Sequence, residues 1–486
     1  MSYCLGADLG TSAIKITLCD EKGNVVSSIE KEYPLSIPFP SYSEQDPHDW
    51  VRAFFDGVKE LAKGREKEIS SICIDGQMHG LVALDEQGEV IRPCILWNDS
   101  RSEKECVYLN EEIGKEVLLK ETGNIAYPGF TLPKILWMRN HEKENYDRIK
   151  TVLLPKDYLN YVLTGVLSSD YSDAAGTLVL DVEKKCWSKK MIEISGLEES
   201  CYPSLCDTGT LLGKVKKEIL EELGIQREVK VYQGAADNAA AAIGNGIILE
   251  GECNISLGTS GTIFVNSKKY TYDEKGAIHS FYSGTSSYCL LACMLSAASS
   301  LKWLNDNIFF EKDYNKDQEK IKEENLGRNH VYFLPYLMGE RSPINDPKAK
   351  GVLFGLGMDN QREDITQAVL EGVCFALKDS LLAIKRMGVE IKESYLTGGG
   401  SRSSLWKRML SSILNIPLYS VTSYGPSYGM ALVALVSEGH FKSLEEAKRE
   451  HIEVKEKIFP EKELVALYEE RYQEFSRIYP SVKSLF

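Results

Sequence analysis

Two copies of the tetrapeptide Leu-Gly-Thr-Ser, at residues 9–12 and 257–260, have the composition of turns that bind an oxyanion. Glycine lets the backbone approach a ligand closely, and the successive N–H groups and hydroxyls of such a turn donate to phosphate oxygens. A single copy would be an ordinary hairpin turn, because motifs of this length are weak evidence. The duplication favours a polyphosphate held from two sides. The candidate residues are Gly10, Thr11, Ser12, Gly258, Thr259 and Ser260.

Asp8 precedes only the first of these turns, and Ser256 takes its place before the second. A carboxylate at the end of an apolar strand is costly to bury unless it is hydrogen-bonded or lies near a cation. Mg²⁺ that accompanies nucleotide phosphates, usually held through water, would be such a cation. We therefore predict that Asp8 lies near the metal. The alternative is a carboxylate that caps or closes the turn.

Asp237 lies in the segment Gly-Ala-Ala-Asp-Asn-Ala-Ala-Ala-Ala-Ile-Gly, which follows a predicted strand at residues 229–232. The alanines leave space for a ligand beside the carboxylate. A lone aspartate that faces a hydroxyl is a suitable general base when phosphoryl transfer is loose and needs little activation of the nucleophile. The alternative is a helix N-cap, a position where aspartate is common.

The loop Gly-Gln-Met-His-Gly at residues 76–80 and the segment Ile-Leu-Trp-Asn-Asp-Ser-Arg at residues 95–101 combine an aromatic ring with polar groups. Such a mixture suits a sugar, whose apolar face packs on a ring and whose hydroxyls need hydrogen bonds. The candidate sugar contacts are therefore Gln77, Met78, His79 and Trp97. A lone histidine is more often structural than ligand-binding, so this interpretation depends on the second segment.

A third kind of site is indicated by Thr-Gly-Gly-Gly-Ser-Arg-Ser at residues 397–403. Three glycines between a predicted strand and a predicted helix allow a flat group to lie against the backbone, and the helix N-terminus adds donors. A plain strand-to-helix connection would explain the same residues. The sequence contains neither Gly-x-Gly-x-x-Gly placed for a dinucleotide nor a Gly-Lys-Ser/Thr phosphate loop.

The elements that position these residues are predicted by an internal repeat. Besides Leu-Gly-Thr-Ser, the tetrapeptide Asp-Glu-Lys-Gly occurs at residues 20–23 and again at 273–276, with a longer loop before the second copy. Two matched pairs in the same order predict duplicated β-hairpins that head two domains. Helical periodicity from about Asp364 to before Gly388, a strand at 394–397 and a helix from Ser403 complete a three-layer α/β pattern.

Composition limits the class of protein. The chain has 486 residues with 57 basic and 71 acidic side chains, a net charge of −14, so a general nucleic-acid binder is excluded. The sequence predicts no membrane span and no secretory signal, and the 12 scattered cysteines indicate reduced thiols of a cytoplasmic protein. We place the domain boundary near residue 245, giving domains 1–245 and 246–486. The charges interspersed from Glu445 to Glu463 predict a solvated helix face.

Longer segments resemble the FGGY family of carbohydrate kinases over nearly the whole chain. They are Tyr-Ser-Glu-Gln-Asp-Pro at 42–47, Gly-Gln-Met-His-Gly at 76–80, Pro-Gly-Phe-Thr-Leu-Pro-Lys-Ile-Leu-Trp at 128–137, Leu-Pro-Lys-Asp-Tyr-Leu at 154–159, Ser-Asp-Ala-Ala-Gly-Thr at 172–177, Phe-Leu-Pro-Tyr-Leu-Met-Gly-Glu-Arg-Ser-Pro at 333–343 and Lys-Gly-Val-Leu-Phe-Gly-Leu at 350–356. The resemblance implies two actin-like ribonuclease-H-fold domains with the active site in the cleft between them. It also implies ATP and Mg²⁺, a sugar substrate and a possible homodimer.

The resemblance further implies roles for individual residues. Asp237 matches the catalytic base and Asp8 the carboxylate near the metal. Met78, His79, Asp237 and Asn238 match sugar contacts, and Trp97 matches an aromatic that closes over the substrate. Phosphate contacts are expected at Thr11, Ser12 and Thr259, and adenosine contacts at Gly398, Gly399, Gly400 and Ser403. One departure is Ser423-Tyr424, where relatives often carry an acidic residue.

Alternatives remain at this level. Gln-Met-His-Gly favours xylulose over glycerol but leaves open another ketose or polyol, such as ribulose or fuculose. An actin-like or chaperone-like ATPase shares the implied fold, because fold alone does not determine function. The sugar-facing segments argue against that second class.

Overall fold

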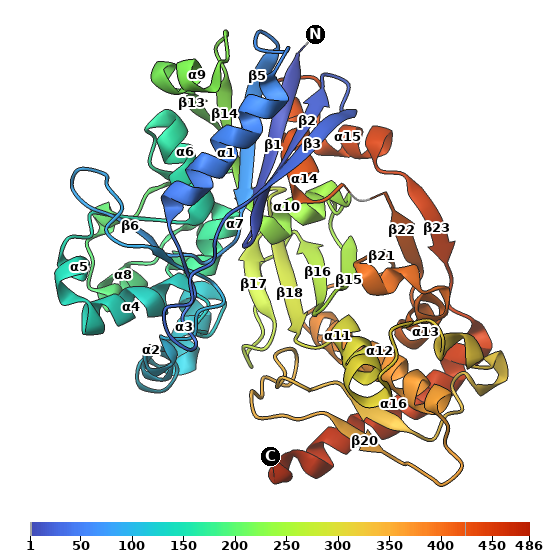
Figure 1. Cartoon of the computed structure of the whole chain (residues 1–486). Coiled ribbons are helices and arrows are strands. Elements are labelled where there is room, and N and C mark those ends of the chain that lie inside the picture. Colours follow the sequence, from blue (N-terminus) through green and yellow to red (C-terminus); the bar gives the residue numbers. More distant parts are fainter. Residues whose placement is uncertain (1, 423) are drawn as a thin grey trace.

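The computed structural model describes residues 2–422 and 424–486, and two sheets dominate it (Figure 1). The first has six strands in the order β13-β14-β5-β1-β2-β3. Their bounds are β1 (Tyr3–Leu9), β2 (Ala13–Asp20), β3 (Val25–Glu32), β5 (Ile69–Gly76), β13 (Leu211–Lys214) and β14 (Lys230–Ala236). β1, β5 and β14 are parallel, whereas β2, β3 and β13 pair antiparallel with their neighbours. We call this sheet and the elements packed on it the first lobe.

The second sheet has seven strands in the order β17-β18-β16-β15-β21-β22-β23 and forms the centre of the second lobe. The bounds are β15 (Cys253–Leu257), β16 (Gly261–Ser267), β17 (His279–Tyr282), β18 (Tyr288–Met294), β21 (Ser394–Thr397), β22 (Leu418–Val421) and β23 (Val454–Ile458). β15 pairs antiparallel with β16 and parallel with β21, as β1 does with β2 and β5. The α/β class and the duplicated strand–turn–strand unit are therefore confirmed.

The second half of the repeat differs from the prediction. Residues 20–23 close a tight turn between the paired strands β2 and β3. Residues 273–276 lie instead in a longer connection to β17, which pairs with β18 and not with β16. Only the first copy of Asp-Glu-Lys-Gly therefore joins two paired strands; after the second copy the connection carries the chain to the sheet edge, and β18 occupies the place beside β16.

Helices cover both sheets. In the first lobe, α1 (Pro47–Ala62) and α6 (Pro155–Thr164) pack on one face, and α9 (Lys217–Leu223) packs beside α1. In the second lobe, α11 (Ala298–Trp303), α12 (Arg362–Arg386), α13 (Ser404–Leu414) and α16 (Lys462–Val482) enclose the largest apolar core. The helix predicted from Asp364 is α12, and a capping box between Gln361 and Asp364 fixes its start. The predicted strand at 394–397 is β21.

The region between β7 and β13 consists of short elements that reach the other face of the second sheet. Its apolar side chains form one cluster with Phe264, Phe281 and Tyr395 of the second sheet. The helices of this region are α2 (Glu103–Val107), α3 (Lys115–Thr122), α4 (Thr131–His141), α5 (Lys143–Asp147), α7 (Tyr171–Ala174) and α8 (Lys189–Ser195).

The remaining strands form short two-stranded pairs outside the two main sheets. The pairs are β4 (Glu44–Gln45) with β7 (Cys94–Ile95), β6 (Val82–Leu84) with β8 (Thr151–Leu153), β9 (Ser168–Asp170) with β12 (Ser204–Cys206), β10 (Leu180–Asp181) with β11 (Cys186–Trp187), and β19 (Tyr332–Leu334) with β20 (Val352–Phe354).

A helix from the C-terminal half packs in the first lobe. α14 (Pro426–Ser437) lies against β1, β5 and α10 (Asp237–Gly244), as Figure 1 shows. The contact is close: a Cβ added at Gly6 would lie 1.9 Å from the carbonyl oxygen of Ser427, so only glycine fits there. Thr17 and Ser427 share a hydrogen bond of 2.8 Å between their hydroxyls. The domain boundary near residue 245 stays a prediction.

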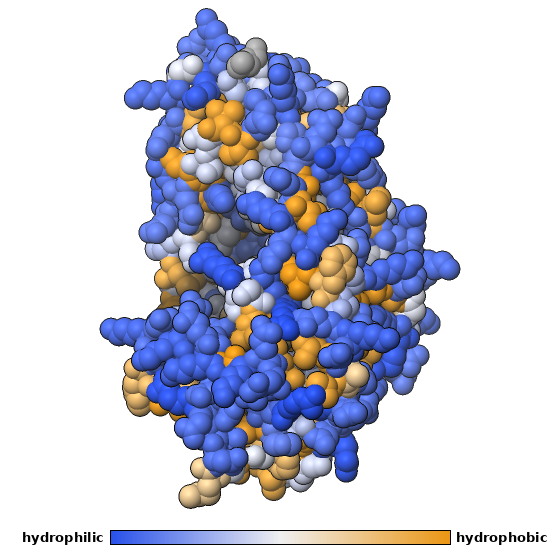
Figure 2. All heavy atoms as spheres, turned by 90° about the vertical axis from the view of Figure 1, so that its right-hand side faces the viewer, coloured by the Kyte–Doolittle hydropathy of each residue, from blue (hydrophilic) through white to orange (hydrophobic). Residues whose placement is uncertain are grey.

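The charged segment from Glu445 to Glu463 is not one helix. It contains α15 (Leu444–His451) from its second residue on, the strand β23 and the start of α16. Lys455, Glu456 and Lys457 are exposed on β23, which is an edge strand. Charges on an edge strand discourage pairing with another chain. The side of the molecule that carries β23 in Figure 1 is largely hydrophilic in Figure 2, with apolar side chains scattered between polar ones.

In the described part of the chain, no helix is both long and apolar enough to cross a membrane. The 12 cysteines all lie among the described residues and are free thiols.

Candidate active site

Three parallel strands of the first sheet end at the same edge, and each end carries a predicted site segment. Leu9 of β1 pairs with Gly76 of β5, and Gly76 pairs with Ala236 of β14. The turn at residues 10–12, the loop at residues 77–79 and the pair Asp237-Asn238 follow these positions. Ligands of α/β proteins bind at such carboxyl ends of parallel strands. The structure therefore brings together the first-lobe residues that the sequence singled out.

Three aspartates gather at this edge. Asp8 pairs across the sheet with Asp75, which is completely buried. Burial raises the pKa of Asp8 to about 6, although a hydrogen bond from the Asp75 carboxyl and the charge of Lys15 lower it. Burial and the charge of Asp8 raise the pKa of Asp237 to about 7, although the hydrogen bond from the backbone N–H of Asn238 to Asp237 Oδ1, at 2.6 Å, lowers it.

Sequence reasoning missed Asp75. Burial, followed by the negative charges of Asp8 and Asp237, raises its pKa well above the ordinary range. An acidic residue directly after the apolar residues 72–74 of β5 was the available signal, but its distance from Asp8 depends on the strand register. In the part of the chain that the structure describes, no group of three or more His, Cys, Asp or Glu side chains is arranged to hold a metal ion directly.

Thr11 links the first turn to the sugar segments. Its hydroxyl donates to Gln77 Oε1 at 3.1 Å and accepts from Trp97 Nε1 at 2.9 Å. Gln45 holds the same turn, because its Nε2 donates to the carbonyl oxygen of Thr11 at 2.6 Å. Ser12 is exposed. The Thr11 hydroxyl is thus already hydrogen-bonded within the protein, whereas that of Ser12 faces outward.

A cavity of about 70 Å³ lies between the lobes beside these residues. Three of the predicted sugar contacts, Met78, His79 and Trp97, line its first-lobe side. Sequence reasoning did not single out the remaining walls, which are Tyr127, Gly129, Phe130, His279, Phe281, Leu291, Cys293 and Arg341. The guanidinium of Arg341 forms no ion pair with a described residue. Aromatic walls and a cationic donor suit a small polyhydroxylated molecule.

His79 is held in an unusual conformation. Its φ of 69° lies in the left-handed region, and its Nδ1 is 2.7 Å from the carbonyl oxygen of Gly176. Lys134 donates to the carbonyl oxygen of His79 at 2.8 Å and fixes the loop to α4. Burial lowers the pKa of His79 well below its ordinary value, so the imidazole is neutral at neutral pH. A neutral ring fixed in this way can exchange hydrogen bonds with sugar hydroxyls.

The second lobe carries a larger pocket of about 750 Å³, within the usual range for ligand sites. Its lining includes five of the predicted nucleotide residues, Gly258, Thr259, Gly399, Gly400 and Ser403. Ser260 is exposed in the turn after β15, and Gly398 has a φ of 88° and begins the glycine turn after β21. Ser403 caps α13 and donates to Gln318 Oε1 at 2.8 Å. The two glycine-containing segments thus share one pocket.

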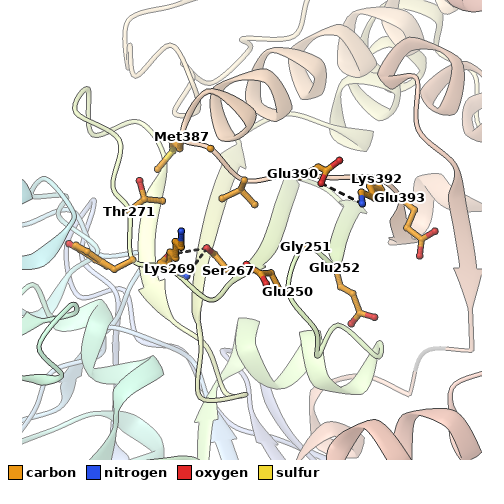
Figure 3. Close-up of a pocket in the computed structure, with 13 residues that line it drawn as sticks. Glu250, Gly251, Glu252, Ser267, Lys269, Thr271, Met387, Glu390, Lys392 and Glu393 are labelled. Atoms are coloured by element: carbon orange, nitrogen blue, oxygen red, sulfur yellow. Dashed lines mark hydrogen bonds and ion pairs between the residues drawn. The ribbon is translucent and has the colours of Figure 1, made fainter.

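A pocket of about 910 Å³, larger than either of these two, lies elsewhere (Figure 3). Its walls include Glu250 and Lys269, at the far end of the β15–β16 hairpin from residues 258–260. Five residues of strand separate the two ends by about 17 Å. Several of its charges are paired within the protein, as Glu390 is with Lys392 at 3.5 Å. Volume alone therefore does not identify the active site of this chain.

Two family domains match the chain. Residues 3–244 match the N-terminal domain of the FGGY family of carbohydrate kinases, and residues 253–438 match its C-terminal domain. The chain belongs to the FGGY family of carbohydrate kinases. It is similar to xylulose kinases of Bacillus subtilis (35% identity, covering 100% of this chain and 98% of that protein) and Escherichia coli (37%, 99% of each). The crystal structure of a xyloylose kinase from Brucella ovis superimposes with a TM-score of 0.94 at 37% identity and 99% coverage of each chain.

Membership of the FGGY family confirms the expected fold of two actin-like domains and assigns the chain as an ATP-dependent carbohydrate kinase. Its substrates are a sugar and a nucleotide. At Ser423-Tyr424, where relatives often carry an acidic residue, only Tyr424 is among the residues that the structure describes. Tyr424 is 40% exposed and its ring lies 4.8 Å from that of Tyr428.

Proposed function

We propose that this FGGY kinase transfers the γ-phosphoryl group of ATP to the terminal hydroxyl of D-xylulose, giving D-xylulose 5-phosphate and ADP. One observation carries the proposal: Asp237, with a raised pKa, stands at the strand edge that also holds the sugar-facing loop of Met78 and His79. The resemblance to xylulose kinases along the full chain supports the choice of sugar.

The proposed step requires one base and an in-line displacement. The sugar occupies the cavity between the lobes, and its terminal hydroxyl faces the carboxylate of Asp237. As the hydroxyl oxygen forms its bond to the γ-phosphorus, the bond from that phosphorus to the bridging β-oxygen breaks and ADP leaves. Asp237 takes the hydroxyl proton. Apolar walls such as Phe130 and Phe281 exclude water, which favours transfer to sugar over hydrolysis.

The nucleotide is proposed to occupy the 750 Å³ pocket, with adenosine near Gly398, Gly399, Gly400 and Ser403. Its phosphates extend towards the turns at residues 10–12 and 258–260. The site fits Mg²⁺, because carboxylate oxygens are ligands that this ion prefers and Asp8 forms no ion pair with a lysine or arginine among the described residues. Asp8 would hold Mg²⁺ through water, and the ion would neutralise phosphate charge. The homodimer and the cytoplasmic location stay predictions.

A panel of acceptors tests the proposed substrate. We expect kcat/KM for D-xylulose to exceed that for D-ribulose, L-fuculose and glycerol by about tenfold or more, because a hydroxyl misplaced in a closed pocket leaves buried donors unpaired. The measurement is ADP release with each acceptor at a fixed ATP concentration. A higher value for another acceptor would reassign the sugar. ATP consumption that is indifferent to every acceptor would favour an actin-like or chaperone-like ATPase.

The pH dependence of the reaction should follow Asp237. Burial and Asp8 raise the pKa of this carboxyl to about 7, so protonation removes the base as the pH falls below that value. We expect kcat/KM for the sugar to fall about tenfold per pH unit below about 7 and to level off above it. The residual rate of the Asp237→Asn variant should lack this limb. A wild-type profile that is flat from about pH 5.5 to 8.5 would contradict the assignment.

A further inference from the structure

A β-bulge lies immediately before Asp237. Gln233 of β14 pairs with Ile74 of β5, but Ala236 pairs with Gly76, so three residue steps on β14 match two on β5. The bulged strand presses against its neighbour: a Cβ added at Gly234 would lie 1.9 Å from the carbonyl oxygen of Ile74. Bulges beside active sites change the direction in which the following residue points. Here the following residues begin α10 with Asp237.

The backbone of the bulge is held by a buried serine. The N–H of Ala236 donates to Ser172 Oγ at 2.9 Å, and Ala236 is the N-cap residue of α10. The Ser172 hydroxyl in turn donates to Asp170 Oδ2, which also accepts from the backbone N–H of Ser172 at 2.8 Å. Ser172 is 1% exposed. A single hydroxyl therefore connects the residue before Asp237 to a buried carboxylate.

That carboxylate belongs to a fully buried charge cluster. Lys156 Nζ lies 2.6 Å from Asp157 Oδ1, 2.8 Å from Asp170 Oδ1 and 3.0 Å from Asp173 Oδ2, and all four side chains are completely buried. Asp157 Oδ1 also accepts from Gln233 Nε2 at 3.4 Å, at the other end of the bulge. The cluster is thus hydrogen-bonded to β14 on both sides of the bulge, directly at Gln233 and through Ser172 at Ala236.

The composition of the cluster argues against a purely stabilising role. Buried ion pairs commonly contribute no more stability than well-packed apolar residues, because desolvation offsets the attraction. Burial raises the pKa of Asp173 well above its ordinary value despite the charge of Lys156, so keeping three carboxyl groups beside one buried lysine costs further stability at neutral pH. This arrangement fixes the geometry of the bulge through directional hydrogen bonds, which apolar packing would not do.

We propose that Ser172, anchored through Asp170 to Lys156, is a positioning residue that sets the direction of Asp237 by holding the β14 bulge. The inference rests on the proposed function of Asp237 as the base. A displacement of about 1 Å at a reacting group costs about 10²-fold in rate. Among the described residues, Ala236 is the one hydrogen-bond partner of the Ser172 hydroxyl beyond its own segment, so removal of the hydroxyl frees the Ala236 N–H without touching substrate.

The test uses the full-length enzyme and the Ser172→Ala variant. We expect kcat to fall about 10- to 100-fold while KM for ATP changes less than about twofold, because the nucleotide pocket lies in the other lobe. Ser172→Thr, which keeps the hydroxyl, should restore most of kcat. The matched control is Ser195→Ala: Ser195 is also completely buried and accepts a backbone N–H, from Leu197 at 3.1 Å, but in α8. It should lower thermal stability similarly and leave kcat unchanged.

Further outcomes separate this inference from the proposed function. In the Asp237→Asn background, Ser172→Ala should lower the residual rate no further, since the two changes remove one function. An unchanged kcat in Ser172→Ala, with Asp237→Asn inactive, overturns only the positioning role. Normal activity of Asp237→Asn overturns the base assignment itself. An equal loss of kcat in Ser195→Ala would reduce the effect to general destabilisation and also overturn the inference.

Discussion

Replacing Asp237 by Ala or Asn is expected to lower kcat by about 10²- to 10⁴-fold while the affinity for ATP stays nearly unchanged, because the lost group accepts the sugar proton and does not line the nucleotide pocket. Sugar-dependent ADP release measures the first quantity and calorimetric titration with ATP the second. Near-normal turnover in either variant would remove Asp237 from the catalytic role.

The same substitution should not destabilise the protein. The folded state raises the pKa of Asp237 from 3.8 to about 7, so it binds the proton more tightly than the unfolded chain does. Stability therefore falls as the pH rises from about 4 to about 7, and the charged carboxylate is a liability above that range. Asp237→Asn removes the charge, with a gain of at most about 4 kcal/mol at pH 8 and a smaller gain at pH 5. Thermal unfolding at the two pH values checks the sign.

A matched carboxylate shows the opposite behaviour. Although burial raises the pKa of Asp20, hydrogen bonds from Asn24 and Lys22 outweigh it and the pKa is lowered. Asp20→Asn should therefore lose stability at neutral pH, whereas Asp237→Asn gains it. A loss of stability in both variants would mean that the negative charge at Asp237 is compensated in the fold.

Replacing Asp8 by Asn or Ala is the second large effect. The rate should fall about 10²-fold or more, and excess Mg²⁺ should fail to restore it, because the carboxylate that would hold the hydrated ion is gone. The measurement is a Mg²⁺ titration of kcat in the wild type and the variant. An unchanged rate and an unchanged Mg²⁺ dependence would exclude the metal role.

Asp75 supplies the control for Asp8. The two carboxyls are cross-strand partners, yet burial and its charged neighbours raise the pKa of Asp75 well above the ordinary range, so it is protonated. Asn is close in shape and charge to a protonated aspartate. Asp75→Asn should therefore lower the rate much less than Asp8→Asn. Equal losses would indicate that the whole cluster, and not the Asp8 charge, supports the reaction.

The residues that sequence reasoning found share one property: they follow strands directly. Asp8, His79 and Asp237 come at the ends of β1, β5 and β14 or just after them, and parallel strands bring such positions together. The helix α12 and the strand β21 were predictable for a similar reason, since local periodicity and a glycine run mark their limits.

The residues that it missed depend on contacts between distant segments. Arg341 and His279 reach the cavity from the second lobe, and nothing near them in the sequence indicates that they face Trp97. Asp75 required the register of β5 against β1. The position of α14 could not be predicted, because this helix is apolar on nearly every side and its sequence pattern does not indicate which sheet it covers.

The position of α14 has a mechanical consequence. The chain passes from one lobe to the other between α10 and β15, returns between β22 and α14, and leaves again between α15 and β23. Three covalent connections close together act as a fulcrum and prevent the lobes from sliding past each other. Asp237 begins the eight-residue α10 and so stands only about 12 Å from that fulcrum. When the lobes rotate about this point to open the cleft, the Asp237 carboxylate moves a short distance, whereas the rim through which the sugar enters moves a long one.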